Sequence, residues 1–148
     1  MTAHTFLFEP ARWQASGVFV DPAGQSLSMA GHSVVLHCDG IWSLTGKVHL
    51  TGEEAAEIEI VNDYRIVPFP PGELQTTWTS NNPALGILKG RFVIVDDTIL
   101  SFFESDDHHF RGTEWLRRLD ADNYENRGVI FEMERLLSAW AADLRREK

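Results

Sequence analysis

Apolar and polar residues alternate along most of this chain, and tryptophans occupy several of the apolar positions. Trp13, Trp42 and Trp78 each lie in a short run of this kind. Because successive side chains of a β-strand point to opposite faces of a sheet, each run places its apolar residues on one face. We therefore expect the three tryptophans on a common inner face. The pattern predicts an all-β fold in which a sheet wraps around an aromatic interior.

Turn signals separate the alternating runs. Asp21-Pro22-Ala23-Gly24 and Asp39-Gly40 are typical turn sequences, because proline presets φ and glycine accepts a positive φ. Their spacing predicts about eight to ten antiparallel strands. Closing such a sheet removes its exposed edges, so we predict a single antiparallel up-and-down β-barrel. A chain of 148 residues suits one domain, which would span residues 1–148.

The charge balance is acidic. The 13 Lys and Arg residues against 22 Asp and Glu residues give a formal net charge of -9, which repels nucleic acids and anionic membrane surfaces. No apolar run approaches the roughly 20 residues of a membrane helix, so we expect no membrane partner. Cys38 is the only cysteine, and the first residues lack the character of a secretory signal, which indicates a cytoplasmic protein. Cys38 alternates with Val34 and Leu36, so we expect it to be buried.

The period of the pattern changes near the C-terminus. Between residues 132 and 146 the apolar side chains fall at helical spacing, in a segment rich in good helix formers. We therefore predict a C-terminal α-helix near residues 132–146. A final hairpin is the alternative, because Leu136, Trp140 and Leu144 also share strand parity.

One stretch carries a family resemblance. Ala11-Arg12-Trp13-Gln14-Ala15-Ser16-Gly17 resembles the Gly-x-Trp-x-Gly-x-Gly opening of nitrobindin-like barrels and the Gly-x-Trp element of lipocalins, in the calycin group. Trp13 and Gly17 match the longer motif, and Ala11 and Ala15 stand where it has glycines. The resemblance implies a small lipocalin-like barrel with a cavity for a hydrophobic molecule or, in the nitrobindin branch, a heme.

Strand parity also selects candidate ligand-binding residues. They are Trp13, Trp42, Asn62, Tyr64, Trp78, Phe92, His109, Arg111 and Trp115. Large aromatic rings can line an apolar cavity or fill it. Parity gives the direction of a side chain but not the volume left over, so a ligand cavity and a filled core both remain open.

The densest polar cluster runs from Glu104 to His109. Carboxylates and imidazoles are metal ligands, but the adjacent His108 and His109 would point to opposite faces of a strand. We therefore expect an acidic turn there and no metal site. His109 shares parity with Arg111 and Trp115, which directs it towards the interior near the cavity mouth. A heme in the barrel would take His109 as its axial ligand.

Three functions fit these features. The first is a protein that binds a small apolar or amphipathic molecule inside the barrel. The second is a barrel enzyme that acts on such a molecule, with a polar pair such as Asn62 and His109 in the cavity. The third is an interaction module with a filled barrel, whose C-terminal helix offers an apolar stripe to a partner. A stripe left uncovered by the barrel would make the chain a homo-oligomer.

Overall fold

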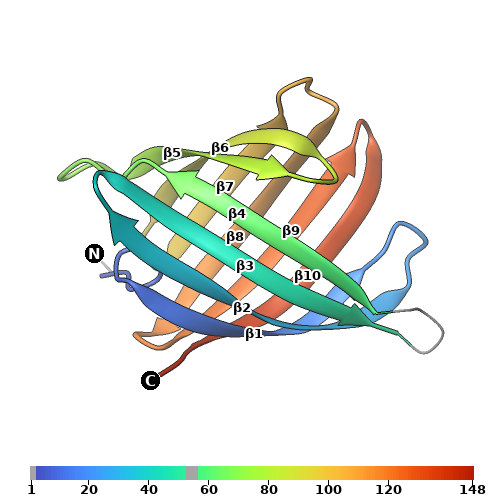
Figure 1. The fold of residues 1–148 in the computed structure, drawn as a ribbon, viewed down its shortest axis with the longest axis horizontal. Coiled ribbons are helices and arrows are strands. Elements are labelled where there is room, and N and C mark those ends of the chain that lie inside the picture. The colour runs from blue at the N-terminus through green and yellow to red at the C-terminus, as the bar shows by residue number, and fades with distance from the viewer. Residues whose placement is uncertain (1–2, 53–56) are drawn as a thin grey trace.

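The chain forms a closed barrel of ten antiparallel strands in a computed structural model that describes residues 3–52 and 57–148 (Figure 1). Each strand pairs with its neighbours in sequence, which confirms the predicted up-and-down barrel. The strands are β1 (Ala11–Val20), β2 (Ser26–Cys38), β3 (Ile41–Thr51), β4 (Ile58–Ile66), β5 (Gln75–Asn82), β6 (Gly86–Val95), β7 (Thr98–Ser105), β8 (Phe110–Asp120), β9 (Asn123–Glu132) and β10 (Arg135–Arg146). Among the described residues, no helix is long and apolar enough to cross a membrane.

The last strand closes the barrel. β10 pairs with β9 on one side and with β1 on the other, where the register runs from Trp13 opposite Arg146 to Val20 opposite Ala139. The predicted helix near residues 132–146 is therefore wrong, and the hairpin alternative is right. A helix would leave β1 and β9 with unpaired edges, whereas a strand there completes both ladders. This tertiary constraint outweighs the helix propensity of the segment.

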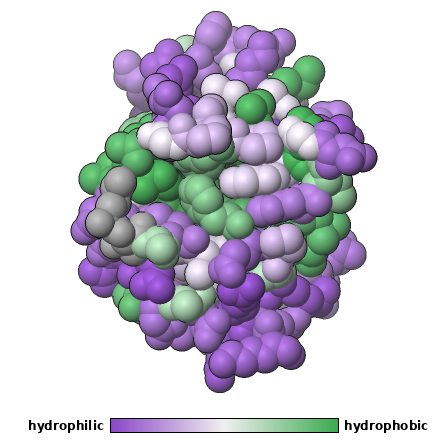
Figure 2. Space-filling view, turned by 90° about the vertical axis from the view of Figure 1, so that its left-hand side faces the viewer, coloured by the Kyte–Doolittle hydropathy of each residue, from purple (hydrophilic) through white to green (hydrophobic). Residues whose placement is uncertain are grey.

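The N-terminal segment, residues 3–10, closes one end of the barrel. Phe6 and Leu7 are buried, and the Phe6 ring packs edge-on against Trp13 at 5.4 Å between centroids. Trp13 in turn meets Tyr124 edge-on at 5.5 Å. Figure 2 faces the side on which Figure 1 places the N-terminus, and it shows a hydrophobic patch bordered above and below by hydrophilic residues. Aromatic packing therefore fills this end of the interior.

Hydrogen bonds from Tyr124 hold this segment in place. Its hydroxyl accepts a bond from the Thr5 N–H at 3.1 Å and lies 2.9 Å from His4 Nδ1. His4 Nε2 lies 2.8 Å from the carbonyl oxygen of Asp96, which can only accept, so Nε2 carries the proton and Nδ1 accepts from Tyr124. Burial lowers the pKa of His4, which favours this neutral form.

The inner face of β2 differs from the prediction. Val35 is fully buried, whereas Leu36 and Cys38 are exposed, so the inward set is the opposite one. His37 belongs to that set: its Nε2 lies 2.7 Å from the Leu7 carbonyl oxygen, and its ring stacks on Trp42 at 4.3 Å. The apolar alternation predicted the wrong face because an inward residue of this strand, His37, is polar and contacts the N-terminal segment that closes the end of the barrel.

The barrel wall is interrupted between β4 and β5. These strands pair only from Tyr64 opposite Ser80 to Ile66 opposite Trp78. β4 begins at Ile58, so its first part has β3 as a partner but not β5. Figure 1 shows β4 diverging from the β5–β6 hairpin beyond the paired section. The first half of β4 therefore borders a gap in the barrel wall, because no strand pairs with it on that side.

The two tyrosines provide a test of the end closure. We expect Tyr124→Phe to lower the free energy of unfolding by about 1–3 kcal/mol, because it leaves buried groups of the N-terminal segment without a partner. Tyr64→Phe is the matched control, since the Tyr64 hydroxyl has no hydrogen-bond partner among the described residues. Urea unfolding of both variants measures the difference, and equal stabilities would contradict the assigned role of Tyr124.

Candidate functional site

The barrel encloses a cavity of about 360 Å³. Apolar side chains form most of its wall, including Leu44, Leu88, Phe92 and Leu116. Seven polar side chains also face it: Ser33, Asn62, Tyr64, Asn82, Glu114, Asn126 and Ser138. A cavity of this size, apolar with a few polar groups, is typical of sites for small organic ligands.

Aromatic rings lying over glycines shape this space. Trp140 covers Gly128, Phe103 covers Gly112, and in both cases a Cβ on the glycine would overlap the ring. The missing side chain on one strand therefore lets the ring from the next strand lie flat against the wall. Trp140 and Phe103 both line the cavity as a result.

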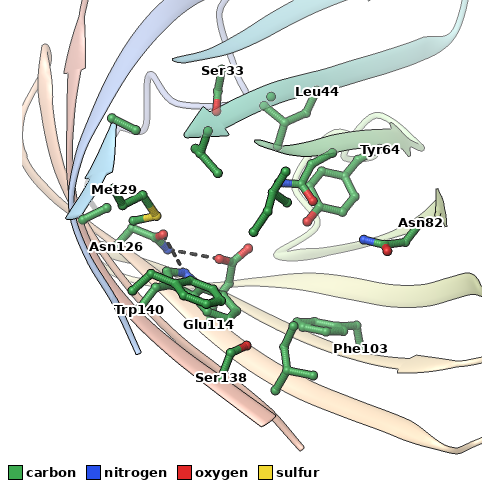
Figure 3. Close-up of a pocket in the computed structure, with 18 of the residues that line it drawn as sticks. Met29, Ser33, Leu44, Tyr64, Asn82, Phe103, Glu114, Asn126, Ser138 and Trp140 are labelled. Carbon is green, nitrogen blue, oxygen red and sulfur yellow. Dashed lines mark hydrogen bonds between the residues drawn. The ribbon is translucent and has the colours of Figure 1, made fainter. Parts of the chain in front are cut away.

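Glu114 is the most unusual residue in the cavity. It lies on β8, and its Oε2 accepts a hydrogen bond from Asn126 Nδ2 at 3.1 Å (Figure 3). The Trp140 indole N–H donates to Asn126 Oδ1 at 3.0 Å. Because an indole nitrogen can only donate, this bond fixes the Asn126 amide with its NH₂ towards Glu114. The second Asn126 N–H donates to the Trp115 carbonyl oxygen at 3.1 Å.

The interior shifts the protonation of both titratable residues that face it. Burial raises the pKa of the Glu114 carboxyl above its usual range, although the Asn126 amide, which donates to it, and the nearby Trp140 indole N–H oppose this rise. Burial also raises the pKa of the Tyr64 hydroxyl, with a further contribution from the Glu114 charge. Tyr64 is therefore a neutral hydrogen-bond donor. Figure 3 shows Glu114 and Tyr64 pointing into the same space.

Six of the predicted ligand-binding residues lie on the inner face, but only part of this set reaches the cavity. Asn62, Tyr64 and Phe92 line it. Trp13 is fully buried in the end closure described above, and Trp42 packs there against Phe8, His37 and Phe69. Trp78 is buried in the core, where its ring contacts Tyr64, Phe92 and Phe103.

The other three predicted residues lie outside the cavity. His109 pairs with Glu132 at 2.9 Å between Nε2 and Oε2, and Arg111 is exposed. The Trp115 ring lies 5.7 Å from the Arg127 guanidinium, on the face opposite to Leu116. On β8 the inward residues are thus the even-numbered ones, among them Glu114, which the sequence reasoning missed. The apolar Leu116 lies two residues further along the same strand, so its position could have indicated that Glu114 faces inward.

The predicted acidic turn is present between β7 and β8. Asp107 accepts hydrogen bonds from Ser105 Oγ at 2.6 Å and from the His109 N–H at 3.0 Å. These bonds lower the pKa of Asp107, the one from Ser105 most. No group of three His, Cys, Asp or Glu side chains suited to a metal ion occurs among residues 3–52 and 57–148.

The structure does not support His109 as the axial ligand of a heme in this cavity. His109 is not among the described lining residues, and its Nε2 pairs with Glu132.

The residues that line the cavity also border the interruption in the barrel wall. Ile60 and Asn62 of β4 lie on one side of it, and Asn82, Ala84 and Leu85 lie on the other. Asn82 holds this second side in a turn, because its Oδ1 accepts from the N–H groups of Ala84 and Leu85. The gap beside β4 is therefore where the cavity approaches the surface.

Gly128→Ala tests the contact between Trp140 and the wall. The added Cβ would overlap the Trp140 ring, so we expect a loss of about 1–3 kcal/mol in the free energy of unfolding and an altered tryptophan emission spectrum. Gly46→Ala is the control, because its nearest neighbour would be Ser33 Oγ at 3.3 Å. Chemical unfolding monitored by fluorescence compares them, and an unchanged Gly128→Ala variant would argue against this packing.

The raised pKa of Glu114 predicts a pH-dependent stability. In the pH range between the unfolded and folded pKa values, the unfolded state releases the proton first, so this residue lowers stability as pH rises and its cost is constant above the folded pKa. We expect Glu114→Gln to gain stability relative to the unsubstituted protein as pH rises from acid to neutral. Urea titrations at several pH values measure the difference. A constant difference would contradict the raised pKa.

The comparisons with known proteins concern the fold. No family model matches the chain, and no curated protein matches its sequence. Two of the similar solved structures cover nearly all of the chain. The S-type phycobiliprotein lyase CpeS from Guillardia theta has a TM-score of 0.71 at 11% identity, covering 97% of this chain and 91% of its own. Rv2717c from M. tuberculosis has a TM-score of 0.65 at 13% identity, covering 94% and 92%. The ten-stranded barrel and these two neighbours together show that the chain has a lipocalin-like β-barrel fold.

Proposed function

We propose that this barrel binds a small apolar or amphipathic molecule in its cavity. The observation that carries the proposal is the space of about 360 Å³ enclosed by an apolar wall with a few convergent polar groups. An interior built only for stability would be packed by side chains, because each empty volume forfeits dispersion contacts. The cavity also reaches the gap in the wall beside β4, and this gap provides a route for a ligand.

The structure does not support the filled interaction module. That hypothesis needs a solid interior and a helical apolar stripe, whereas the interior has a cavity and the C-terminal segment is strand β10. Small-molecule binding therefore remains the stronger proposal.

An enzymatic role is the second candidate. Glu114 has a raised pKa and shares the cavity with the Tyr64 hydroxyl, and carboxyls of this kind serve as general acids or bases. The Asn62 and His109 pair expected from the sequence does not meet there, because His109 lies outside the cavity. CpeS, a structural neighbour named as a phycobiliprotein lyase, is an example of an enzyme with this fold. Turnover of a bound molecule that is lost in Glu114→Gln would establish this role, and an intact bound molecule would favour simple binding.

Filling the cavity should abolish binding. Ser33 faces the cavity, so we expect Ser33→Phe to weaken binding of the fluorescent probe N-phenyl-1-naphthylamine by about tenfold or more. Ser28 lies on the same strand and is exposed, which makes Ser28→Phe the matched control. A fluorescence titration compares the two variants with the unsubstituted protein. Equal affinities in all three, or no enhancement in any, would refute binding in the barrel.

A further inference from the structure

Glu114 faces the cavity without a counter-charge. The only titratable side chains among the described lining residues are Glu114 and Tyr64, and burial keeps the Tyr64 hydroxyl neutral. None of the lining residues is a lysine, arginine or histidine. The residues outside the described part, 1–2 and 53–56, include none of these types in the sequence. Among the described residues that line the cavity, none carries a positive charge that would neutralise a Glu114 carboxylate.

The surroundings of Glu114 supply a hydrogen-bond donor to one of its two carboxyl oxygens. Oε2 receives the N–H of Asn126, and the Trp140 indole fixes the direction of that amide. Oε1 accepts no hydrogen bond from any residue that the structure describes. Because a carboxylate has acceptor sites on both oxygens, Oε1 remains free for a donor that enters the cavity. A buried carboxylate with one unfilled oxygen is stabilised most by a donor that also carries positive charge.

We propose that the ligand of this barrel is an amphipathic amine, with an apolar body against the cavity wall and a protonated nitrogen paired with Glu114. This inference rests on the proposed function and specifies the chemical class of the ligand. The nitrogen supplies both the missing positive charge and the missing donor at Oε1. The apolar body occupies the space between residues such as Leu44, Phe92 and Leu116.

The charge of the whole protein favours the same class of ligand. A formal net charge of -9 attracts cations towards the barrel and repels anions during approach. An amphipathic carboxylate would meet a second negative charge at Glu114 and find no basic residue in the lining set. A neutral alcohol would gain a hydrogen bond to Glu114 but would leave its charge uncompensated.

A matched series of ligands tests the inference on the unsubstituted protein. The probes are 1-naphthylmethylamine, 1-naphthylmethanol and 1-naphthoic acid, which share one aromatic skeleton and differ in the charge of the polar group. Isothermal titration calorimetry at neutral pH should rank the amine first, ahead of the alcohol by about tenfold or more, with the acid weakest. An alcohol or acid that binds as well as the amine would overturn the inference.

Glu114→Gln then removes the charge while its amide oxygen still accepts from Asn126. We expect this variant to lose about tenfold or more of its affinity for the amine and to keep its affinity for the alcohol. Ser33→Phe should block all probes, which separates binding in the cavity from attraction to the acidic surface. Unchanged amine affinity in Glu114→Gln would overturn the inference and leave the proposed function intact. Failure of all three probes and of N-phenyl-1-naphthylamine to bind would instead refute the proposed function.

Discussion

The hydrogen-bond ladder between β1 and β10 is the constraint on which the rest of the structure depends. It joins the two ends of the chain and converts an open sheet of ten strands into a barrel without an edge at that seam. Once the barrel is closed, every strand has one face towards a shared interior, and the two-residue period decides which side chains meet there. A C-terminal segment with good helix formers is held as a strand because both of its neighbours need a partner.

The interior divides into a packed end and an open part. At the packed end Phe6, Trp13 and Tyr124 fill the barrel and hydrogen bonds anchor the N-terminal segment. Further along, Gly128 and Gly112 let the rings of Trp140 and Phe103 lie flat against the wall, so these rings take up little of the interior volume. This arrangement leaves a central cavity, and Glu114 lies in its wall. The two parts of the interior therefore use different tryptophans: Trp13 belongs to the closure and Trp140 lines the cavity.

Much of this arrangement could be predicted from the sequence, because apolar and polar residues alternate clearly wherever the inward side chains are apolar. Trp13, Trp42 and Trp78 face inward as expected, and so do Asn62 and Tyr64. The reasoning failed where inward residues are polar or lack a side chain.

On β8 the inward residues include Gly112 and Glu114, while the large ring of Trp115 lies outside. On β2 Ser33 faces the cavity and His37 faces the end closure, so the apolar Leu36 gave the wrong parity. Polar residues such as Glu114, Ser33 and His37 face inward but interrupt the apolar alternation from which the inner face was predicted. The candidate site was the least predictable part of the barrel for this reason.

The short pairing of β4 with β5 separates access to the cavity from the integrity of the barrel. Because the interruption is bordered by Ile60 and Asn62 on one side and by the Asn82 turn on the other, the passage lies well away from the closed end at Trp13. A ligand of the proposed kind would enter and leave there while the β1–β10 seam and the N-terminal anchor stay intact. The lifetime of a complex would be set by the side chains that border this gap, and the global stability of the fold could change without altering it.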